Sequence, residues 1–167
     1  MHAAAYDYIY CEFHLWRKDK TKLDILEIGS LNINGSVRSI LEPFAATYLG
    51  IDMQDGPGVD LVADGAFYEL PEAYDAIVTA EAFEHTPDWK QIIKQSYINL
   101  KPNGIFIATM AGEGRPFHSG IDGGQLQEHE HYANIGAWEL KQTLKKIGFQ
   151  QVDVNVLGQD TRCWAIK

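Results

Sequence analysis

The chain has 167 residues, of which 46% are hydrophobic and 11% aromatic, and its formal net charge is −9. This length is sufficient for one domain with a full core, and the composition is that of a globular protein. The negative charge argues against a nucleic-acid partner, because binding to phosphates needs clustered Lys and Arg. Cys11 and Cys163 are too few for a disulfide framework or a metal knuckle, which favours reduced thiols.

The first residues bear on targeting and on the first helix. The segment MHAAAYDYIYCEFHLW has no basic region, so we do not expect a signal peptide. No apolar run approaches the ~20 residues of a membrane span, and we expect a cytoplasmic monomer or homodimer with no membrane partner. Apolar residues at helical spacing predict a helix within residues 1–20 that packs on a sheet, with a lid or a dimer contact as alternatives; they are Tyr6, Ile9, Phe13 and Trp16.

Strand-like and helix-like patterns then alternate. LDILEIG predicts a strand, SVRSILEPF a helix and ATYLGIDM a second strand, and VDLVAD and YDAIVTA predict two more strands. Thr86 is typical of a helix N-cap, with Pro87 in the first turn. The run 101–104, Lys-Pro-Asn-Gly, is expected to end that helix and to turn into the strand IFIATM.

The C-terminal third closes the pattern. Asn134 is expected to cap a helix that carries Lys145 and Lys146 in its last turn and ends before Gly148. FQQVDVNVLG and TRCWAIK predict two strands joined by a tight turn. The expected fold is therefore α/β, with a mainly parallel central sheet of about seven strands, helices on both faces and a C-terminal antiparallel hairpin.

The first two strands end in residues that suggest a ligand site. The first apolar run ends in Glu27 and Gly29, and the second closes on Asp52, 23 positions after that glycine. A strand–loop–helix–strand unit of this kind binds an adenosine-sized ligand at the strand ends, with the second acid on the ribose hydroxyls. The alternatives are that Asp52 only caps a turn and that Gly29 only serves the bend.

Five segments in order resemble the class I, Rossmann-like methyltransferases that use S-adenosylmethionine. They are LDILEIGS, YLGIDM, LVADGAF, YDAIVTAEAFEHTPDW and LKPNGIFIAT, and the resemblance runs from about Leu23 to Ile147. It implies a Rossmann-like fold and a single methyltransferase domain over residues 1–167. The N-terminal helix would then precede the first strand, and the polar stretch 111–134 would be a long loop on the substrate side.

The resemblance also implies which residues bind the cofactor. The methionine portion would lie against Glu27, Gly29 and Ser30, and Asp52 would hold the ribose hydroxyls. The remaining implied residues flank the adenine or border the methyl group: Met53, Asp64, Gly65, Ala66, Thr79 and Ala80. Leu31 stands where the family usually has a second glycine, which also disfavours a dinucleotide site. An acid at Glu27 suits a cofactor with a sulfonium and an ammonium group better than it suits a pyrophosphate.

Methyl transfer from a sulfonium is a direct displacement, which requires mainly alignment of the reactants. A hydroxyl acceptor also benefits from a base, and the candidates are Glu81, His85 and His118. Structural roles for His85 and His118 remain open alternatives. His129 and His131 are further candidate bases; they are also candidate metal ligands or part of a solvated loop, and no metal site is predicted there.

We therefore expect an S-adenosylmethionine-dependent methyltransferase that forms S-adenosylhomocysteine and acts on a small-molecule or sugar-like acceptor. A protein that binds the cofactor without turnover is the first alternative. A nicotinamide-dependent oxidoreductase is the second, and the glycine spacing disfavours it.

Overall fold

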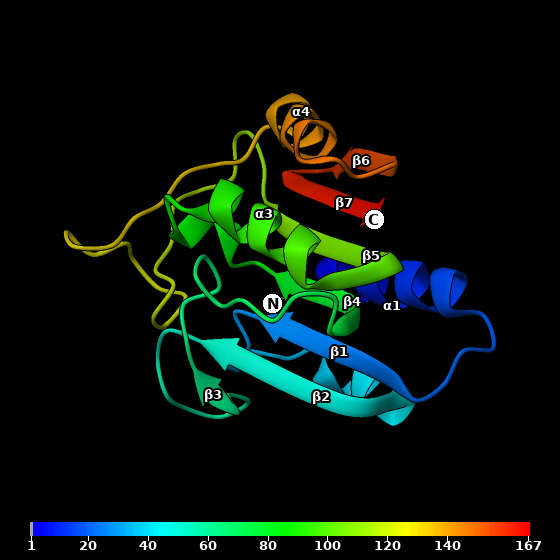
Figure 1. The fold of residues 1–167 in the computed structure, drawn as a ribbon. Coiled ribbons are helices and arrows are strands. Elements are labelled where there is room, and N and C mark those ends of the chain that lie inside the picture. Colours follow the sequence, from blue (N-terminus) through cyan, green and yellow to red (C-terminus); the bar gives the residue numbers. More distant parts are fainter. Residues whose placement is uncertain (1) are drawn as a thin grey trace.

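The computed structural model describes residues 2–167 and arranges them around one seven-stranded sheet (Figure 1). The strands are β1 (Leu23–Ile28), β2 (Ala45–Asp52), β3 (Leu61–Val62), β4 (Tyr74–Ala80), β5 (Leu100–Ala111), β6 (Gln151–Leu157) and β7 (Asp160–Ile166). Their order is β3-β2-β1-β4-β5-β7-β6. The pairs from β3 to β5 are parallel, and β7 runs antiparallel to both of its neighbours. The predicted α/β fold, with its C-terminal hairpin, is confirmed.

Helices cover both faces of the sheet. They are α1 (Ala3–Arg17), α2 (Arg38–Leu41), α3 (Trp89–Asn99) and α4 (Ala137–Ile147), with 3-10 turns η1 (Glu42–Phe44) and η2 (Phe83–His85). One core cluster joins α1 and α2 to inward-facing side chains of β1, β4 and β5. The second cluster joins α3 and α4 to the opposite face. In Figure 1, α3 lies in front of the sheet and α1 behind it.

Three helices begin later in the chain than the sequence predicts, or are shorter. The helix predicted from Ser36 is only α2, because the chain tightens into η1 around Pro43, which has no N–H to donate. Thr86 accepts a hydrogen bond from the Asp88 N–H (3.1 Å), and α3 begins at Trp89. Asn134 donates to the Arg115 carbonyl (3.1 Å), and α4 begins after Gly136.

The predicted turn at residues 101–104 is part of β5 in the structure. Pairing with β4 is irregular there, and Asn103 has a φ of +63°. The C-terminal residue keeps this irregular segment in the sheet: the Asn103 N–H donates to the Lys167 carbonyl (3.0 Å), and the Lys167 N–H donates to the Gly104 carbonyl (3.1 Å). A long-range pairing therefore overrides the local turn signal.

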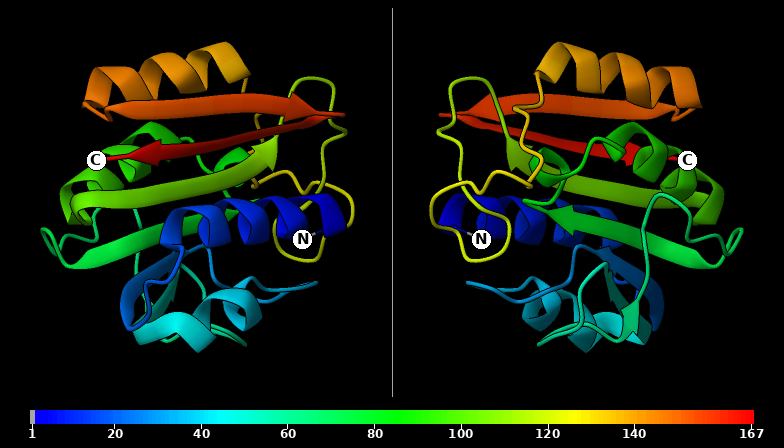
Figure 2. Two further views of the ribbon diagram at one scale, coloured as in Figure 1. Left: turned by 90° about the vertical axis from the view of Figure 1, so that its right-hand side faces the viewer. Right: turned by 90° about the vertical axis from the view of Figure 1, so that its left-hand side faces the viewer.

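The carboxyl ends of β1, β2, β4 and β5 meet at one edge of the sheet, because these strands are parallel. The long segment between β5 and α4 projects beyond the same edge, in yellow on the left of Figure 1, and both views of Figure 2 show it. Within residues 2–167, no helix combines the length and the apolar character needed to cross a membrane.

Candidate functional site

A cavity of about 640 Å³ opens at this edge of the sheet. Its lining comes from the ends of β1, β2 and β4, from the loop after β1, and from the long loop after β5. Eight of the ten predicted cofactor-binding residues line it: Glu27, Gly29, Ser30, Asp52, Met53, Asp64, Gly65 and Ala80. The other two, Ala66 and Thr79, are fully buried and lie outside the lining. All three candidate bases, Glu81, His85 and His118, line the cavity.

The loop after β1 is held close to β2. The N–H groups of Gly29 and Ser30 both donate to the Ile51 carbonyl, at 2.9 and 3.1 Å. The Ser30 hydroxyl is buried and has no hydrogen-bond partner within the described residues. This hydroxyl lies against β2, because a Cβ atom built on Gly50 would be 2.8 Å from its Oγ.

Gly29 is required here for two separate reasons. Its φ is +78°, and a Cβ atom built on it would lie 2.7 Å from the Cβ of Ala82. Gly158, in the β6–β7 turn, has a φ of +60° and no atom within 4 Å of its own built Cβ. The two positions therefore share a left-handed backbone but differ in the space around the side chain.

Gly29→Ala is expected to lower the free energy of unfolding by about 1 kcal/mol or more beyond the loss caused by Gly158→Ala, because only the first adds a steric overlap to the backbone cost. Denaturant unfolding of both variants measures the difference. Equal losses in the two variants would show that the contact with Ala82 relaxes without cost.

Asp52 orders the loops at the end of β2 and keeps acceptor positions free. Its Oδ2 accepts the Leu31 N–H (3.1 Å) and its Oδ1 accepts the Gln54 N–H (3.0 Å), so it does order the loops on either side. A carboxylate has about four acceptor positions, and two remain after these bonds. The side chain is half-buried and lines the cavity. Asp52 can therefore hold the loop and still accept two vicinal hydroxyls.

Glu27 is a buried carboxyl group, 3% exposed, that also lines the cavity. Burial raises its pKa from an ordinary 4.5 to about 7, although the hydrogen bond from the Tyr48 hydroxyl (2.5 Å) and the nearby Arg38 act in the opposite direction. The Arg38 guanidinium lies over the Tyr48 ring, 4.4 Å from its centroid. At neutral pH Glu27 is therefore close to half-ionised, and a cationic ligand would favour its charged form.

The turn after β3 fits closely against β1. Asp64 accepts the Ala66 N–H on Oδ1 (2.8 Å), which leaves Oδ2 for other donors. A Cβ on Gly65 would lie 2.6 Å from Cγ2 of Ile28, so this position needs a glycine for close approach. Ala66 is in the core beneath the turn.

Beyond β4, three rings meet, and two of them, those of His85 and His118, line the cavity. The rings of His85, His118 and Tyr132 make mutual edge contacts, with centroids 5.0–5.3 Å apart. Burial, and secondarily His118, lowers the pKa of His85 to about 4, so this imidazole is neutral at pH 7. Nδ1 of His118 lies 3.2 Å from the Tyr132 hydroxyl, which can orient the ring.

Glu84, next to His85, is fully buried, and neither of its carboxyl oxygens has a hydrogen bond of normal geometry. Burial and the neighbouring Glu81 raise the pKa of this carboxyl group above its ordinary range, and the backbone N–H groups of Glu84 and Ala111 lower it less. Glu84 therefore keeps its proton to a higher pH than an exposed carboxyl group does.

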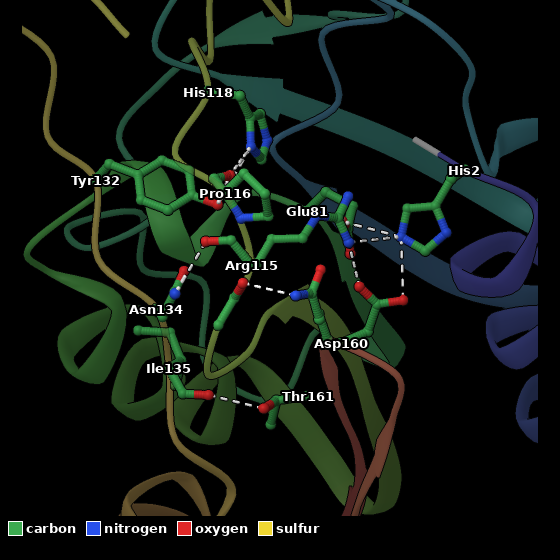
Figure 3. A network of polar contacts seen from close by, with 12 residues as sticks. His2, Glu81, Arg115, Pro116, His118, Tyr132, Asn134, Ile135, Asp160 and Thr161 are labelled. Carbon is green, nitrogen blue, oxygen red and sulfur yellow. Dashed lines mark hydrogen bonds and ion pairs between the residues drawn. The ribbon is translucent and has the colours of Figure 1, made fainter.

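Glu81 takes part in an ion-pair network (Figure 3). Its side chain is 9% exposed, and Oε2 lies 3.3 Å from Nε2 of His2 and 3.7 Å from Nη2 of Arg115. Arg115 and His2 also pair with Asp160, at the start of β7. Glu81 has a φ of +55°, which is uncommon for a residue other than glycine. The network joins β4, the long loop and the hairpin around this strained residue.

Glu130, between His129 and His131 of the long loop, holds three groups of that loop by hydrogen bonds. Glu130 accepts the Ser119 hydroxyl (2.9 Å) and the N–H groups of Gly120 and Gln127 (both 2.8 Å). His129 and His131 flank it and line the cavity. Within the described residues, donor atoms closer than 4.8 Å are found in two other groups: Glu84, His85 and His118, and His2, Glu81 and Asp160.

The sequence did not predict the residues that surround Glu27 and Glu81. Tyr48 lies on the same face of the sheet as Glu27 because β2 pairs with β1 in the register Ile25↔Tyr48 and Glu27↔Gly50. Alternation along β2 would have suggested Tyr48 once that register was known. No local signal indicates that Arg115 lies beside Glu81.

Comparisons with known proteins agree with this geometry. A family model described as a methyltransferase domain matches residues 4–154. A ubiquinone biosynthesis O-methyltransferase of Pseudomonas entomophila is 27% identical over 113 residues, which cover 57% of this chain and 49% of the relative. That of Pseudomonas savastanoi is 33% identical over 82 residues, 39% of this chain and 35% of the relative. The chain thus matches about half, or less, of the length of these curated relatives.

Solved structures with low sequence identity share the fold. Burkholderia thailandensis 1,6-didemethyltoxoflavin-N1-methyltransferase, solved with 1,6-didemethyltoxoflavin and S-adenosylhomocysteine bound, superposes with a TM-score of 0.74 at 14% identity, over 98% of this chain and 78% of that one. A methyltransferase from Archaeoglobus fulgidus superposes with a TM-score of 0.70 at 12% identity, over 97% and 94%. Because the family model spans nearly all of the strands, helices and loops that form the cavity, the chain belongs to the methyltransferase-domain family.

Proposed function

We propose that this chain is an S-adenosylmethionine-dependent methyltransferase that acts on a small-molecule acceptor. The observation that carries this proposal is the arrangement of Glu27, Gly29 and Asp52 along one wall of the cavity. The buried acid Glu27 matches the positive charge of an adenosylated sulfonium, and the free acceptor positions of Asp52 match its ribose hydroxyl groups. Gly29, directly after β1, also lines the cavity and has no side chain that would occupy it.

The cavity has the size of a small-molecule site. Its volume of about 640 Å³ lies within the range of roughly 300–1,000 Å³ that is typical of small-molecule sites. Glu27 and Asp52 mark the cofactor wall, and His85 and His118 mark the opposite end. An acceptor at that end would lie between the long loop and the tip of β4.

When bound, S-adenosylmethionine supplies a methyl group on a sulfonium, and its transfer leaves S-adenosylhomocysteine. The residues of this chain align the acceptor's lone pair with the methyl carbon and exclude water. If the acceptor is a hydroxyl, its proton passes to a base, for which His118 and His85 are in place. A nitrogen acceptor needs weaker assistance of this kind. The relatives named above include both an O- and an N-methyltransferase, which supports either atom in a small-molecule acceptor.

A protein that binds the cofactor without turnover is the second candidate. Two observations favour it. The carboxylate of Glu81 is already engaged in ion pairs with His2 and Arg115, and the lowered pKa of His85 makes this imidazole a weak base. A nicotinamide-dependent oxidoreductase is disfavoured because Glu27 would lie beside a pyrophosphate.

Calorimetric titration with S-adenosylmethionine, S-adenosylhomocysteine and NAD separates these candidates. We expect both adenosyl ligands to bind and NAD not to bind, and we expect S-adenosylhomocysteine to be released in the presence of a suitable acceptor. Preferential binding of NAD would refute the proposal. Adenosyl binding with no transfer across a broad acceptor panel would favour the silent protein.

Glu27 is expected to make cofactor binding depend on pH. A cationic ligand favours the ionised carboxylate, so binding releases a proton, and affinity rises as the pH increases through the pKa of about 7. Between pH 6 and 7.5 the affinity for S-adenosylmethionine should rise roughly eightfold and then level off.

Two variants isolate the contribution of Glu27. Glu27→Gln removes the titrating group and should leave only the weak dependence that comes from the ligand's own amino group. Tyr48→Phe removes a hydrogen bond that lowers the Glu27 pKa, so the rise should move to higher pH. A wild-type profile as flat as that of Glu27→Gln would exclude Glu27 from the cofactor site.

A further inference from the structure

Acidic side chains line the cavity, and no lysine or arginine of the described residues does. Five carboxylic acids line it: Glu27, Asp52, Asp64, Glu81 and Glu130. Four imidazoles line it as well: His85, His118, His129 and His131. Among residues 2–167, the lining includes no lysine and no arginine. The cavity therefore offers an anion no permanent positive charge.

Two guanidinium groups act on lining acids without lining the cavity themselves, and both are already paired. Arg38 bonds to Asp60 at 2.5 Å and to the Gly58 carbonyl at 2.9 Å. Arg115 is held by Asp160 and Glu81. Both cations are thus neutralised by neighbouring acids, and neither is free to receive a phosphate or a carboxylate from the cavity.

The acceptor end of the cavity carries two of the five acids, Glu81 and Glu130. Glu81 has one carboxyl oxygen, Oε1, that is buried without a hydrogen-bond partner. Glu130 accepts three hydrogen bonds within the loop, and no lysine or arginine of the described residues forms an ion pair with it. His85 is neutral at pH 7 and contributes no positive charge.

The rim of the cavity adds an apolar surface to this negative interior. Ile33 and Ile121 line the cavity and are 40% and 41% exposed, and Met53 is 67% exposed. A molecule that enters past these side chains buries apolar area and meets carboxylates, without meeting a fixed cation.

We propose that the methyl acceptor carries no negative charge and presents an amine, a nitrogen heterocycle or an uncharged hydroxyl, so that carboxylates, phosphates and sulfates are excluded by repulsion within the cavity. This inference rests on the proposed function and narrows its substrate class. The cofactor brings a net charge of about +1 to a lining with five acids, of which Glu81 is already paired with Arg115, so a negative excess persists while the acceptor binds.

Binding of charge-matched probes to the protein loaded with S-adenosylhomocysteine tests this inference without knowledge of the true acceptor. Benzylamine, benzyl alcohol, benzoate and phenyl phosphate share one ring and differ in charge. Backbone amide shifts of Gly120 and Ile121 report entry into the acceptor end. We expect benzylamine to bind at least tenfold more tightly than benzoate, with phenyl phosphate weaker still, and we expect the difference to shrink as salt is added.

A positive charge introduced at the rim of the cavity tests whether charge governs the binding of the probes. Ile121→Lys should strengthen benzoate binding at least tenfold and weaken benzylamine binding, whereas Ile121→Met, of similar length and uncharged, should change neither by more than twofold. Ile121 is exposed, so the lysine needs no buried space. An unchanged benzoate affinity in Ile121→Lys would show that charge does not govern entry.

The results separate this inference from the function on which it rests. If S-adenosylhomocysteine does not bind, the proposed function fails before any probe is added. If it binds, and benzoate or phenyl phosphate then binds as tightly as benzylamine, or none of the probes binds, only the inference on the acceptor charge is refuted.

Discussion

Asp52→Ala is expected to weaken the binding of S-adenosylmethionine by about 2 kcal/mol or more, roughly 30-fold, as is typical when a charged hydrogen-bond acceptor is lost. In the structure, two acceptor positions of this carboxylate remain after its bonds to the Leu31 and Gln54 N–H groups. The vicinal hydroxyls of a ribose would occupy both. Calorimetry with the wild type and the variant measures the loss.

Loosening of the loop would also reduce affinity, and two controls distinguish this from the loss of the ribose contact. Asp52→Asn keeps one oxygen acceptor and should give an intermediate loss. Asp55→Ala removes an exposed acid from the same loop that does not line the cavity, and it should change the affinity by less than twofold. An unchanged affinity in Asp52→Ala would remove this residue from the cofactor site.

The second large effect is expected at the acceptor end. If the acceptor is a hydroxyl, His118→Gln should lower kcat about 100-fold, the lower range for loss of a general base, while the affinity for S-adenosylmethionine changes by less than twofold. His118 lines the cavity, and the Tyr132 hydroxyl lies 3.2 Å from its Nδ1. Tyr132→Phe should therefore lower kcat by a smaller factor, because it frees the ring without removing it.

Comparison with the other histidines makes this result specific. His85→Gln should have a smaller effect, because a pKa of about 4 makes His85 the weaker base. His14→Gln alters an imidazole on α1 that packs on Phe44, away from the cavity lining, and should leave kcat unchanged. A kcat for His118→Gln equal to that of the wild type, with a hydroxyl acceptor, would assign His118 to ordering of the loop.

The architecture was predictable because its signals are local. Alternating apolar runs of strand and helix length predict a parallel sheet, and parallel strands must bring their carboxyl ends to one edge. Glu27, Gly29 and Asp52 stand at those ends in the sequence itself. Their positions along the cavity wall therefore follow from the strand pattern alone, as does the C-terminal hairpin around Gly158.

Helix boundaries were harder to predict because one polar side chain can bond to several backbone groups. Asn134 is a typical N-cap, yet it bonds to the Arg115 carbonyl, 19 residues earlier in the chain. Residues 101–104 resemble a turn, yet pairing with Lys167 keeps them in β5. In both cases a contact distant in sequence outcompeted a local preference that is worth only about 1 kcal/mol.

The sequence by itself determined the order of the elements, the edge at which the site lies and the acids at the strand tips, because each depends on neighbours within one element. Only the tertiary structure decided the environment of those acids. Tyr48 reaches Glu27 through the register of β1 and β2, and Arg115 reaches Glu81 from a loop more than thirty residues away. Burial, partners and charge balance arise where distant segments meet, so the pKa of Glu27 and the single sign of the lining charge became visible only in the folded chain.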